Sequence, residues 1–553
     1  MSHHPTPIRV LSLLLALTML LGTLCACADG ASGSENTATI AESDPVSSES
    51  SSEAAASDET TASDETTASD ETTAPSGTTA PDETEEQESE EATDGLPECE
   101  LPELDLGGEE YVFLTQYREG WTSGELTVEG LNSDPVNDAV FTRNQIVETQ
   151  LHVTIRNMPE YTDNPEDVAN KLVASVKTGI HEYDVVAAPM YTMTGVSLDG
   201  NFRNLLRADH LDLEKPWWTQ GLNEALEYKD MQFIAAGSAL LSLYRFSFAT
   251  MFNKDLFDGV GIPYLYENVR DKTWTLDYQN SIIEAFHVDN GNGEQDKTGD
   301  IYGFVSNDNI SVDPYWSSCN MTILGRDEEG AYTLADFNIE KLAAITEKVM
   351  QLFYGHDQAS YDFKYRNYDS EQDDIRDMFA GGYAAMATLR IMALESGSMQ
   401  SMSQLYGVVP MPKYDTAQEN YGTMVHDVFT TLAIPATATD DRFQNTGALL
   451  EALAYQGHTV VRPAYYDVAL RTKLVTDPDS SDMLDILFES IRIDPGILYS
   501  VTMARFHDSF RKLIKNKDDT VASTYKAKTK EAQKVLSKKI VNKLNKLAKK
   551  EAE

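Results

Sequence analysis

The stretch PVNDAVFTRNQIVETQLHVTI, residues 135–155, predicts the fold class of this chain most directly. Asp134 can cap a helix and the proline after it suits a first turn, so we expect a helix over 135–150. The run 152–155 is a candidate strand, and another strand candidate, 111–114, precedes the helix. Strand, helix and strand in this order indicate a βαβ unit, and therefore an α/β protein.

The same alternation of short β-rich runs and helical patterns continues along the chain. We expect further helices from near Thr275 and over 446–455, where Asn445 can cap. A body of this size can hold two α/β lobes with separate cores. The sequence contains no glycine-rich phosphate loop, His-Glu-x-x-His or Gly-x-Ser-x-Gly motif, so no motif favours an enzyme. The further strand candidates are 183–188, 233–236, 384–387, 406–410 and 428–434.

The N-terminus has the parts of an export signal. Arg9 gives a positive start, the apolar run 10–21 follows, and the small residue Ala26 stands just before Cys27. The apolar run is too short to span a bilayer comfortably as a permanent helix. Bacterial lipoproteins look like this, so we expect residues 1–26 to be a lipoprotein signal peptide and Cys27 to carry the lipid. The alternative is an ordinary secretion signal without a lipid anchor.

Residues 27–106 have a composition that cannot build a core. They contain no aromatic residue, and they hold 24 acidic residues and no basic one. We expect a disordered tether, in which the hexamer ASDETT repeats three times over 56–73 as a spacer. About half of the net charge of −47 belongs to this tether. The body, 107–553, is only mildly acidic, which makes nucleic acid a poor partner.

The C-terminal end is basic. Residues 511–553 hold 14 Lys or Arg and 5 acidic residues, and their apolar residues have a roughly helical spacing. We expect an amphipathic helix over about 511–550, which lies on the acidic body or contacts an anionic surface of the envelope. With Cys27 lipidated, only Cys99 and Cys319 could pair; Cys99 lies in the tether, so we expect no structural disulfide.

Eight short sequence phrases resemble, in the same order, extracellular solute-binding lipoproteins of carbohydrate ABC importers, the family 1 type of Gram-positive bacteria. The likeness covers about residues 108–510. No single phrase is very specific, but their order behind a lipoprotein signal and a tether is. The phrases are YVFL (111–114), DAVFTRN (138–144), YDVV (183–186), LEKPWW (213–218), MFNKDLF (251–257), DIYGF (300–304), MFAGGYAAM (378–386) and YGVVPMPK (406–413).

The resemblance implies a periplasmic-binding-protein fold of type II, with two α/β lobes joined by a hinge. It places the first lobe at about 107–240 plus 384–426 and the second at about 252–380, with later helices shared. Hinge candidates are 237–244 and 427–434. The implied function is binding without catalysis: a monomer on the outer face of the cell membrane captures a carbohydrate by lobe closure and delivers it to an ABC permease.

A sugar-binding cleft needs aromatic faces for the pyranose ring and polar groups for its hydroxyls. The loops that the family places at the interlobe face supply the candidates. Of the two neighbours Tyr465 and Tyr466, only one is expected to reach the cleft. Trp217 and Trp218 are expected to be structural. The ligand-binding candidates from these loops are Arg118, Trp121, Tyr191, Arg245, Arg390 and Tyr466.

The cluster Asp313-Pro-Tyr-Trp316 resembles a Glu-Pro-Tyr setting that maltodextrin-binding relatives present to their sugar. By this likeness Asp313 accepts two hydroxyl hydrogen bonds while Tyr315 or Trp316 stacks on the ring. The alternative is a loop in which the Trp packs on its own lobe.

The loop 290–296 resembles a calcium loop of EF-hands and of alginate-binding relatives. Asn290, Asn292, Glu294 and Asp296 would offer oxygen ligands for a structural calcium ion. However, Val288 stands where an acidic first ligand is expected. A plain Asn/Gly turn is the alternative.

Other functions stay open at this point. A surface-anchored enzyme acting on polysaccharides would need a pair of carboxylates across a cleft. A binding protein of the same fold could take a peptide or another solute. Because the body is mildly acidic, an acidic glycan is disfavoured unless Arg118, Arg245 and Arg390 converge.

Overall fold

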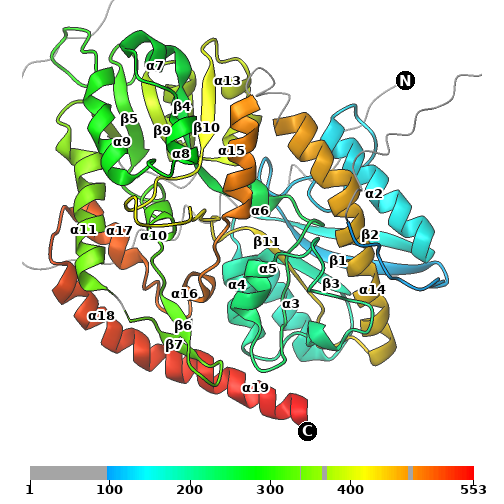
Figure 1. The fold of residues 1–553 in the computed structure, drawn as a ribbon. Helices are drawn as coiled ribbons and strands as arrows, with labels where there is room; N and C mark the ends of the chain where they lie inside the picture. Colours follow the sequence, from blue (N-terminus) through cyan, green and yellow to red (C-terminus); the bar gives the residue numbers. More distant parts are fainter. Residues whose placement is uncertain (1–95, 337, 364–369, 471–477) are drawn as a thin grey trace, which may run out of the picture. The chain divides into compact units, whose positions relative to one another are not determined.

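The computed structural model of the chain describes residues 96–336, 338–363, 370–470 and 478–553. The signal peptide, Cys27 and most of the expected tether lie outside these residues and remain predictions. The described residues form two large sheets, each the centre of one lobe, and a small hairpin of β6 (Leu324–Arg326) and β7 (Tyr332–Leu334) (Figure 1).

The sheet of the first lobe has four strands in the order β11-β3-β1-β2. β1 pairs in parallel with β2 and β3, whereas β11 is antiparallel to β3. Helix α2 (Pro135–Leu151) joins β1 to β2, and the Asp134 carboxylate accepts from the Val136 and Asn137 N–H groups at 3.0 and 2.9 Å. The expected βαβ unit is therefore confirmed. The strands are β1 Glu109–Tyr117, β2 Val153–Tyr161, β3 Val185–Pro189 and β11 Thr430–Ala433.

Two local expectations for the first lobe need correction. Helix α14 begins at Asp440 rather than at residue 446, because the Thr439 side chain, not that of Asn445, caps it by accepting from the Arg442 N–H group. The run 233–236 belongs to no named strand and makes one isolated bridge, Ala235 with Leu432. The helices beside this sheet are α3 Glu166–Thr178, α4 Met190–Ser197, α5 Gln220–Leu226 and α14 Asp440–Gln456 (Figure 1).

Trp217 and Trp218 are structural. Both indoles are buried and donate to the Glu451 carboxylate of α14 at 2.9 Å each. A side chain at Gly237 would collide with the Trp217 carbonyl, so only glycine allows the backbone to pass this close to the two tryptophans. The two tryptophans thus fix α14 against the segment that leads out of the first lobe.

The sheet of the second lobe has five strands in the order β10-β4-β9-β5-β8. β5 is parallel to β8 and β9, and β4 is antiparallel to β9 and β10. We expected 384–426 to return to the first lobe, but β9 and β10 both lie in this sheet. β9 pairs with β4 and β5, which both belong to this lobe, and its seven buried residues suit the central place between them. The strands are β4 Phe248–Asn253, β5 Tyr302–Asn307, β8 Ser360–Phe363, β9 Ala384–Arg390 and β10 Tyr406–Val409.

Short helices surround this second sheet (Figure 1). The helix expected near Thr275 is confirmed, since the Thr275 hydroxyl caps α9 by accepting from the Tyr278 N–H group at 3.2 Å. The helices are α7 Lys254–Val260, α8 Leu265–Arg270, α9 Leu276–Ile282, α10 Pro314–Ser318, α11 Ile339–Met350, α12 Ser370–Ala380, α13 Gly397–Gln400 and α15 Pro478–Glu489.

Two of the segments that pass between the lobes lie side by side. The first leaves through α6 (Ser242–Arg245) into β4, and the second returns from β10 to β11. An isolated antiparallel bridge, Ser247 with Val425, joins the two crossings. The hinge candidates 237–244 and 427–434 lie next to this bridge.

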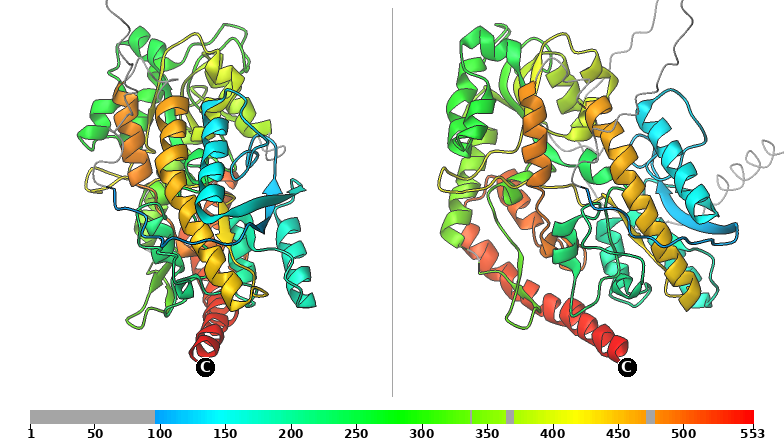
Figure 2. Two further views of the ribbon diagram at one scale, coloured as in Figure 1. Left: turned by 90° about the vertical axis from the view of Figure 1, so that its right-hand side faces the viewer. Right: turned by 45° about the vertical axis from the view of Figure 1, so that its right-hand side comes forward.

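The basic C-terminus forms several helices instead of one. The chain breaks at Lys517, whose φ is 54°, and passes through a π-helical turn at Leu536–Val541. Apolar side chains including Tyr525, Leu536 and Ile540 are buried, while most lysines face solvent. Figure 2 shows α18 running on into α19. These helices are α17 Asp508–Asn516, α18 Val521–Val535 and α19 Asn542–Ala552, and the short helix α16 Pro495–Leu498 precedes them.

None of the helices in the described part of the chain has the length and apolar character needed to cross a bilayer.

Candidate functional site

The candidate site lies where strand ends of both sheets approach each other. β1 and β3 end at Tyr117 and Pro189 in the first lobe, and β9 ends at Arg390 in the second. In open α/β sheets, ligands bind outside the carboxyl ends of the parallel strands. Trp121, in the loop after β1, lies beside Arg390, whose guanidinium carbon is 4.2 Å from the indole centroid. The two lobes therefore meet at this tryptophan.

Trp121 is the centre of the site. The Arg118 guanidinium carbon lies 3.7 Å from its ring centroid, so two arginines from different lobes contact one indole. The Phe246 ring is 5.4 Å away, and the His426 ring is 6.2 Å away. Trp121 is half-buried, so part of its ring faces the adjoining cavity.

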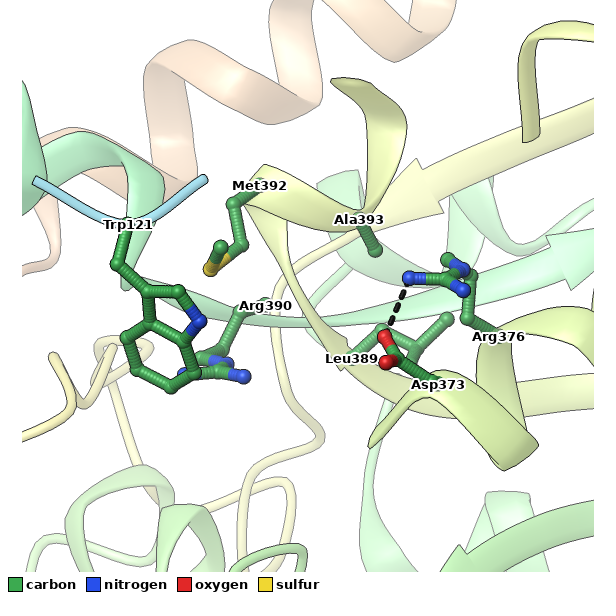
Figure 3. A pocket seen from close by; sticks show the side chains of 7 residues that line it. All are labelled: Trp121, Asp373, Arg376, Leu389, Arg390, Met392 and Ala393. Atoms are coloured by element: carbon green, nitrogen blue, oxygen red, sulfur yellow. Dashed lines mark hydrogen bonds and ion pairs between the residues drawn. The ribbon is translucent and has the colours of Figure 1, made fainter. Parts of the chain in front are cut away.

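Beside Trp121 lies a small cavity of about 70 Å³ (Figure 3). The sulfur of Met392 points toward the indole. In the same view the Arg390 guanidinium lies below Met392 and beside the indole. On the far side, Arg376 of α12 is paired with Asp373 at 2.5 Å. The side chains of Leu389 and Ala393 complete the lining.

Arg245 holds the Trp121 loop in place. Its guanidinium donates to both Glu395 carboxylate oxygens, at 3.0 and 2.8 Å, and to the carbonyls of Gly120, at 2.9 Å, and Trp121. The Tyr465 hydroxyl donates to the same carboxylate at 2.9 Å. Arg245 thus joins the first-lobe loop to the segment after β9, and these contacts give it a positioning role; its ligand contact stays a prediction.

His426 lies behind the site and was not predicted from the sequence. Its Nδ1 accepts from Arg390 at 3.2 Å, and its Nε2 is 3.7 Å from the Asp427 carboxylate. Burial, and then the charges of Arg390, Arg511 and Arg118, lower the pKa of His426 well below its usual value. The imidazole is therefore neutral near pH 7, and its Nδ1 can accept a hydrogen bond from the Arg390 guanidinium. The only sequence signal was its place directly before a hinge candidate.

Asp427 links this network to Tyr191. Its backbone carbonyl accepts from the Tyr191 N–H group at 3.3 Å, and burial raises the pKa of its carboxyl. Tyr191 is the second residue of α4, and the Arg505 guanidinium carbon lies 5.9 Å from its ring. Tyr191 is therefore joined to the candidate site through Asp427, but it does not line the cavity beside Trp121.

The structure gives the Asp313 cluster roles that differ from the prediction. Asp313 follows β5 but is bound by the fork of Arg511 from α17, with Nε at 3.0 Å from Oδ1. Tyr315 is fully buried and packs on Phe353. The Tyr315 ring is therefore part of the core of its own lobe, and a ligand role for the cluster stays a prediction that this packing does not favour.

Trp316 and Tyr466 also lie in the interior. The Trp316 ring stacks on Tyr525 of α18 at 6.2 Å and meets Phe510 edge-on. The Tyr466 hydroxyl donates to Asp485, and its ring packs on Phe488 of α15. Sequence could not separate these rings from cleft aromatics, because their partners are far along the chain.

The loop 290–296 is closed by its own hydrogen bonds. The side-chain amides of Asn290 and Asn292 each donate to the Asp296 carboxylate at 2.9 Å. Glu294 is exposed, and its N–H group donates to Asn292. In the described ranges, no group of three or more His, Cys, Asp or Glu is arranged to hold a metal ion. Calcium remains a prediction that the geometry does not favour.

No family model and no curated relative matches this sequence, whereas solved structures do. One is the galacto-N-biose-/lacto-N-biose I-binding protein of the ABC transporter from Bifidobacterium longum, in complex with lacto-N-biose. It is 12% identical with a TM-score of 0.53, over 79% of this chain and 99% of that chain.

A second match is the GacH receptor of Streptomyces glaucescens, solved unliganded and with acarbose. It is 10% identical with a TM-score of 0.50, over 78% of this chain and 99% of that chain. At such identities the matches establish the fold. The expected type II periplasmic-binding-protein fold, with two α/β lobes, is confirmed.

Proposed function

We propose that this chain is the carbohydrate-binding component of an ABC importer, held on the outer face of the cell membrane by a lipid on Cys27. The observation that carries the proposal is the meeting of Trp121 and Arg390, from opposite lobes, beside one cavity. The fold supports it, because the two similar structures named above are a binding protein in complex with lacto-N-biose and a receptor in complex with acarbose. The ligand is proposed to be an oligosaccharide.

The site chemistry suits a sugar. An indole face can stack on the apolar C–H surface of a pyranose ring, and a guanidinium donates several hydrogen bonds in one plane. Ligand contacts from both lobes favour the closed arrangement, which is the form in which they are all made. The paired crossings beside Ser247 and Val425 are the proposed hinge.

The proposed delivery partner is a pair of ABC permease subunits. Residues 27–106 would be a spacer, whose mean reach as a flexible chain of about eighty residues is near 50 Å. That reach would let the lobes sample solute away from the bilayer and still dock on a permease. Cys27→Ser should release the protein from the membrane fraction; retention there would contradict the anchor.

The binding proposal is tested by calorimetric titration of the mature chain with a panel of oligosaccharides. We expect saturable binding without product formation, and a loss of about tenfold or more in affinity for Trp121→Ala, because a stacked aromatic face is removed. Tyr161→Ala is the matched control, since Tyr161 is an aromatic residue with 76% exposure on β2. Unchanged affinity in Trp121→Ala would contradict the assignment of the site.

A further inference from the structure

The C-terminal helices connect the two lobes in addition to the crossing segments described above. We infer that residues 521–552, called the C-terminal strap below, hold the lobes in the arrangement in which Trp121 meets Arg390. The strap consists of α18, the π-helical turn and α19, and it begins on the second lobe and ends on the first (Figure 1). Its expected effect on sugar affinity rests on the proposed function, whereas its effect on the positions of the lobes does not.

Helix α18 is fixed to the second lobe by a buried tyrosine. The Tyr525 ring is fully buried and stacks on Trp316 of α10, with the ring centroids 6.2 Å apart and the ring planes at 19°. Phe506 meets the Tyr525 ring edge-on at 5.5 Å. The helix also packs on α11 of the same lobe. Buried aromatic rings contribute much of the packing energy of a core, so the first part of the strap moves with the second lobe.

Helix α19 is fixed to the first lobe by Asn545 and Leu547. The side-chain carbonyl of Asn545 accepts from the Tyr228 hydroxyl at 3.1 Å and from the Lys229 ammonium at 3.0 Å, in the turn after α5. A Cβ atom at Gly200, in the turn after α4, would lie only 3.3 Å from a methyl group of Leu547. The Leu547 side chain therefore lies directly on the backbone of the first lobe, and the end of the strap moves with that lobe.

The hairpin of β6 and β7 supports the same connection. It joins α10 to α11 of the second lobe, and its Arg326 guanidinium donates to the Glu224 carbonyl at 2.8 Å and to the Glu227 carbonyl at 2.5 Å. The Tyr332 hydroxyl donates to the Ala225 carbonyl at 2.5 Å. These acceptors lie at the C-terminal end of α5, where carbonyl groups have no partner within the helix. Because α18 and the π-helical turn pack on β7, the hairpin and the strap act together.

A change in the relative position of the lobes would break contacts at one end of the strap. Contacts that are made in only one arrangement shift the conformational equilibrium toward it. The arrangement that the strap favours is the one in which the Arg390 guanidinium carbon lies 4.2 Å from the Trp121 indole centroid. A sugar bound between these residues would find the lobes already positioned, and its apparent affinity rises with the fraction of molecules in that state.

Distances between spin labels test the positions of the lobes without any ligand. One label is attached at Lys177→Cys on α3 of the first lobe and the other at Val260→Cys on α7 of the second, because both side chains are exposed. The labels are placed in the full mature chain carrying Cys27→Ser and Cys99→Ser, in which the remaining Cys319 is buried. Double electron–electron resonance should give one narrow distance distribution in this protein.

Asn545→Ala combined with Leu547→Ala removes the main contacts of α19 and leaves α18 in place. The distance distribution should then broaden or shift, and calorimetric titration should show oligosaccharide affinity lowered by about fivefold or more. Lys546→Ala combined with Lys550→Ala is the matched control, because both lysines are exposed on the same helix. Thermal melting reports folding. If the first variant fails to fold, Arg326→Gln carries the same test, because it removes only contacts of the hairpin.

The outcomes separate the strap from the proposed function. A broadened or shifted distribution in the α19 variant, with the lysine control unchanged, supports the strap. Unchanged distances in a folded α19 variant overturn the strap and leave the carbohydrate receptor standing. If the wild-type chain binds no oligosaccharide, the proposed function fails, and the distances still decide whether the strap holds the lobes.

Discussion

Replacing Arg245 by Met should destabilise the protein and loosen the binding loop at once. The guanidinium joins Glu395, which it contacts at 2.8 and 3.0 Å, to the carbonyls of Gly120 and Trp121. The side chains are 11% and 27% exposed, so the pair is largely removed from water. Breaking a buried pair costs about 3–5 kcal/mol, and the partial exposure of Glu395 lowers our expectation to about 2–3 kcal/mol.

Urea unfolding followed by tryptophan fluorescence measures this loss as a change in unfolding free energy. The double variant Arg245→Met with Glu395→Met is the internal control, since it removes both charges. Its loss should be smaller than the sum of the two single losses by about 1 kcal/mol or more. Sugar affinity should also fall in Arg245→Met, because Trp121 loses its anchor. If the unfolding free energy of Arg245→Met lies within about 0.5 kcal/mol of wild type, or if the losses of the two single variants simply add, Arg245 and Glu395 do not hold the loop in this way.

Three further predictions follow from individual contacts. Burial and the charge of Arg462 lower the pKa of His458 to about 4. The folded state therefore binds this proton more weakly than the unfolded state, so the unfolding free energy is highest above pH 6.5 and falls as the pH drops toward 4. Between pH 7 and 5, urea titrations should show that wild type loses about 2 kcal/mol more unfolding free energy than His458→Gln does; equal losses would contradict the lowered pKa of His458. Asp313→Asn should lower the unfolding free energy by about 2–4 kcal/mol, because the Arg511 guanidinium loses its carboxylate partner. A variant that is as stable as wild type but binds sugar more weakly would instead support a ligand role for Asp313. Calcium or a chelator should leave the thermal midpoint unchanged, because Asp296 is bound within its own loop; a rise that Asp296→Ala abolishes would place a calcium site there.

The local elements could be predicted well from the sequence, because their causes are local. Asp134 caps α2 and Thr275 caps α9, and each signal stands within a few residues of the helix that it starts. The lobe to which β9 belongs could not be predicted in this way. Its partners β4 and β5 are more than seventy residues distant, and seven buried residues in a row suit a central strand of either sheet.

The candidate site could be predicted only in part, again because some of its contacts join residues that are distant in the sequence. Trp121 and Arg390 were found as cleft candidates, but their contact and the part of His426 depend on the fold bringing distant segments together. Arg511 was read only as one charge of a basic helix, whereas it occupies Asp313. Trp316 shows the limit of composition, since a loop tryptophan and a core tryptophan look alike until the C-terminal helix packs on it.

The most direct measurement of the central claim is the affinity of the mature chain for oligosaccharides, compared with that of Trp121→Ala. We predict saturable calorimetric binding to at least one oligosaccharide, weakened about tenfold or more by Trp121→Ala and unchanged by Tyr161→Ala. Binding that both variants leave intact would contradict a sugar site at the meeting of Trp121 and Arg390.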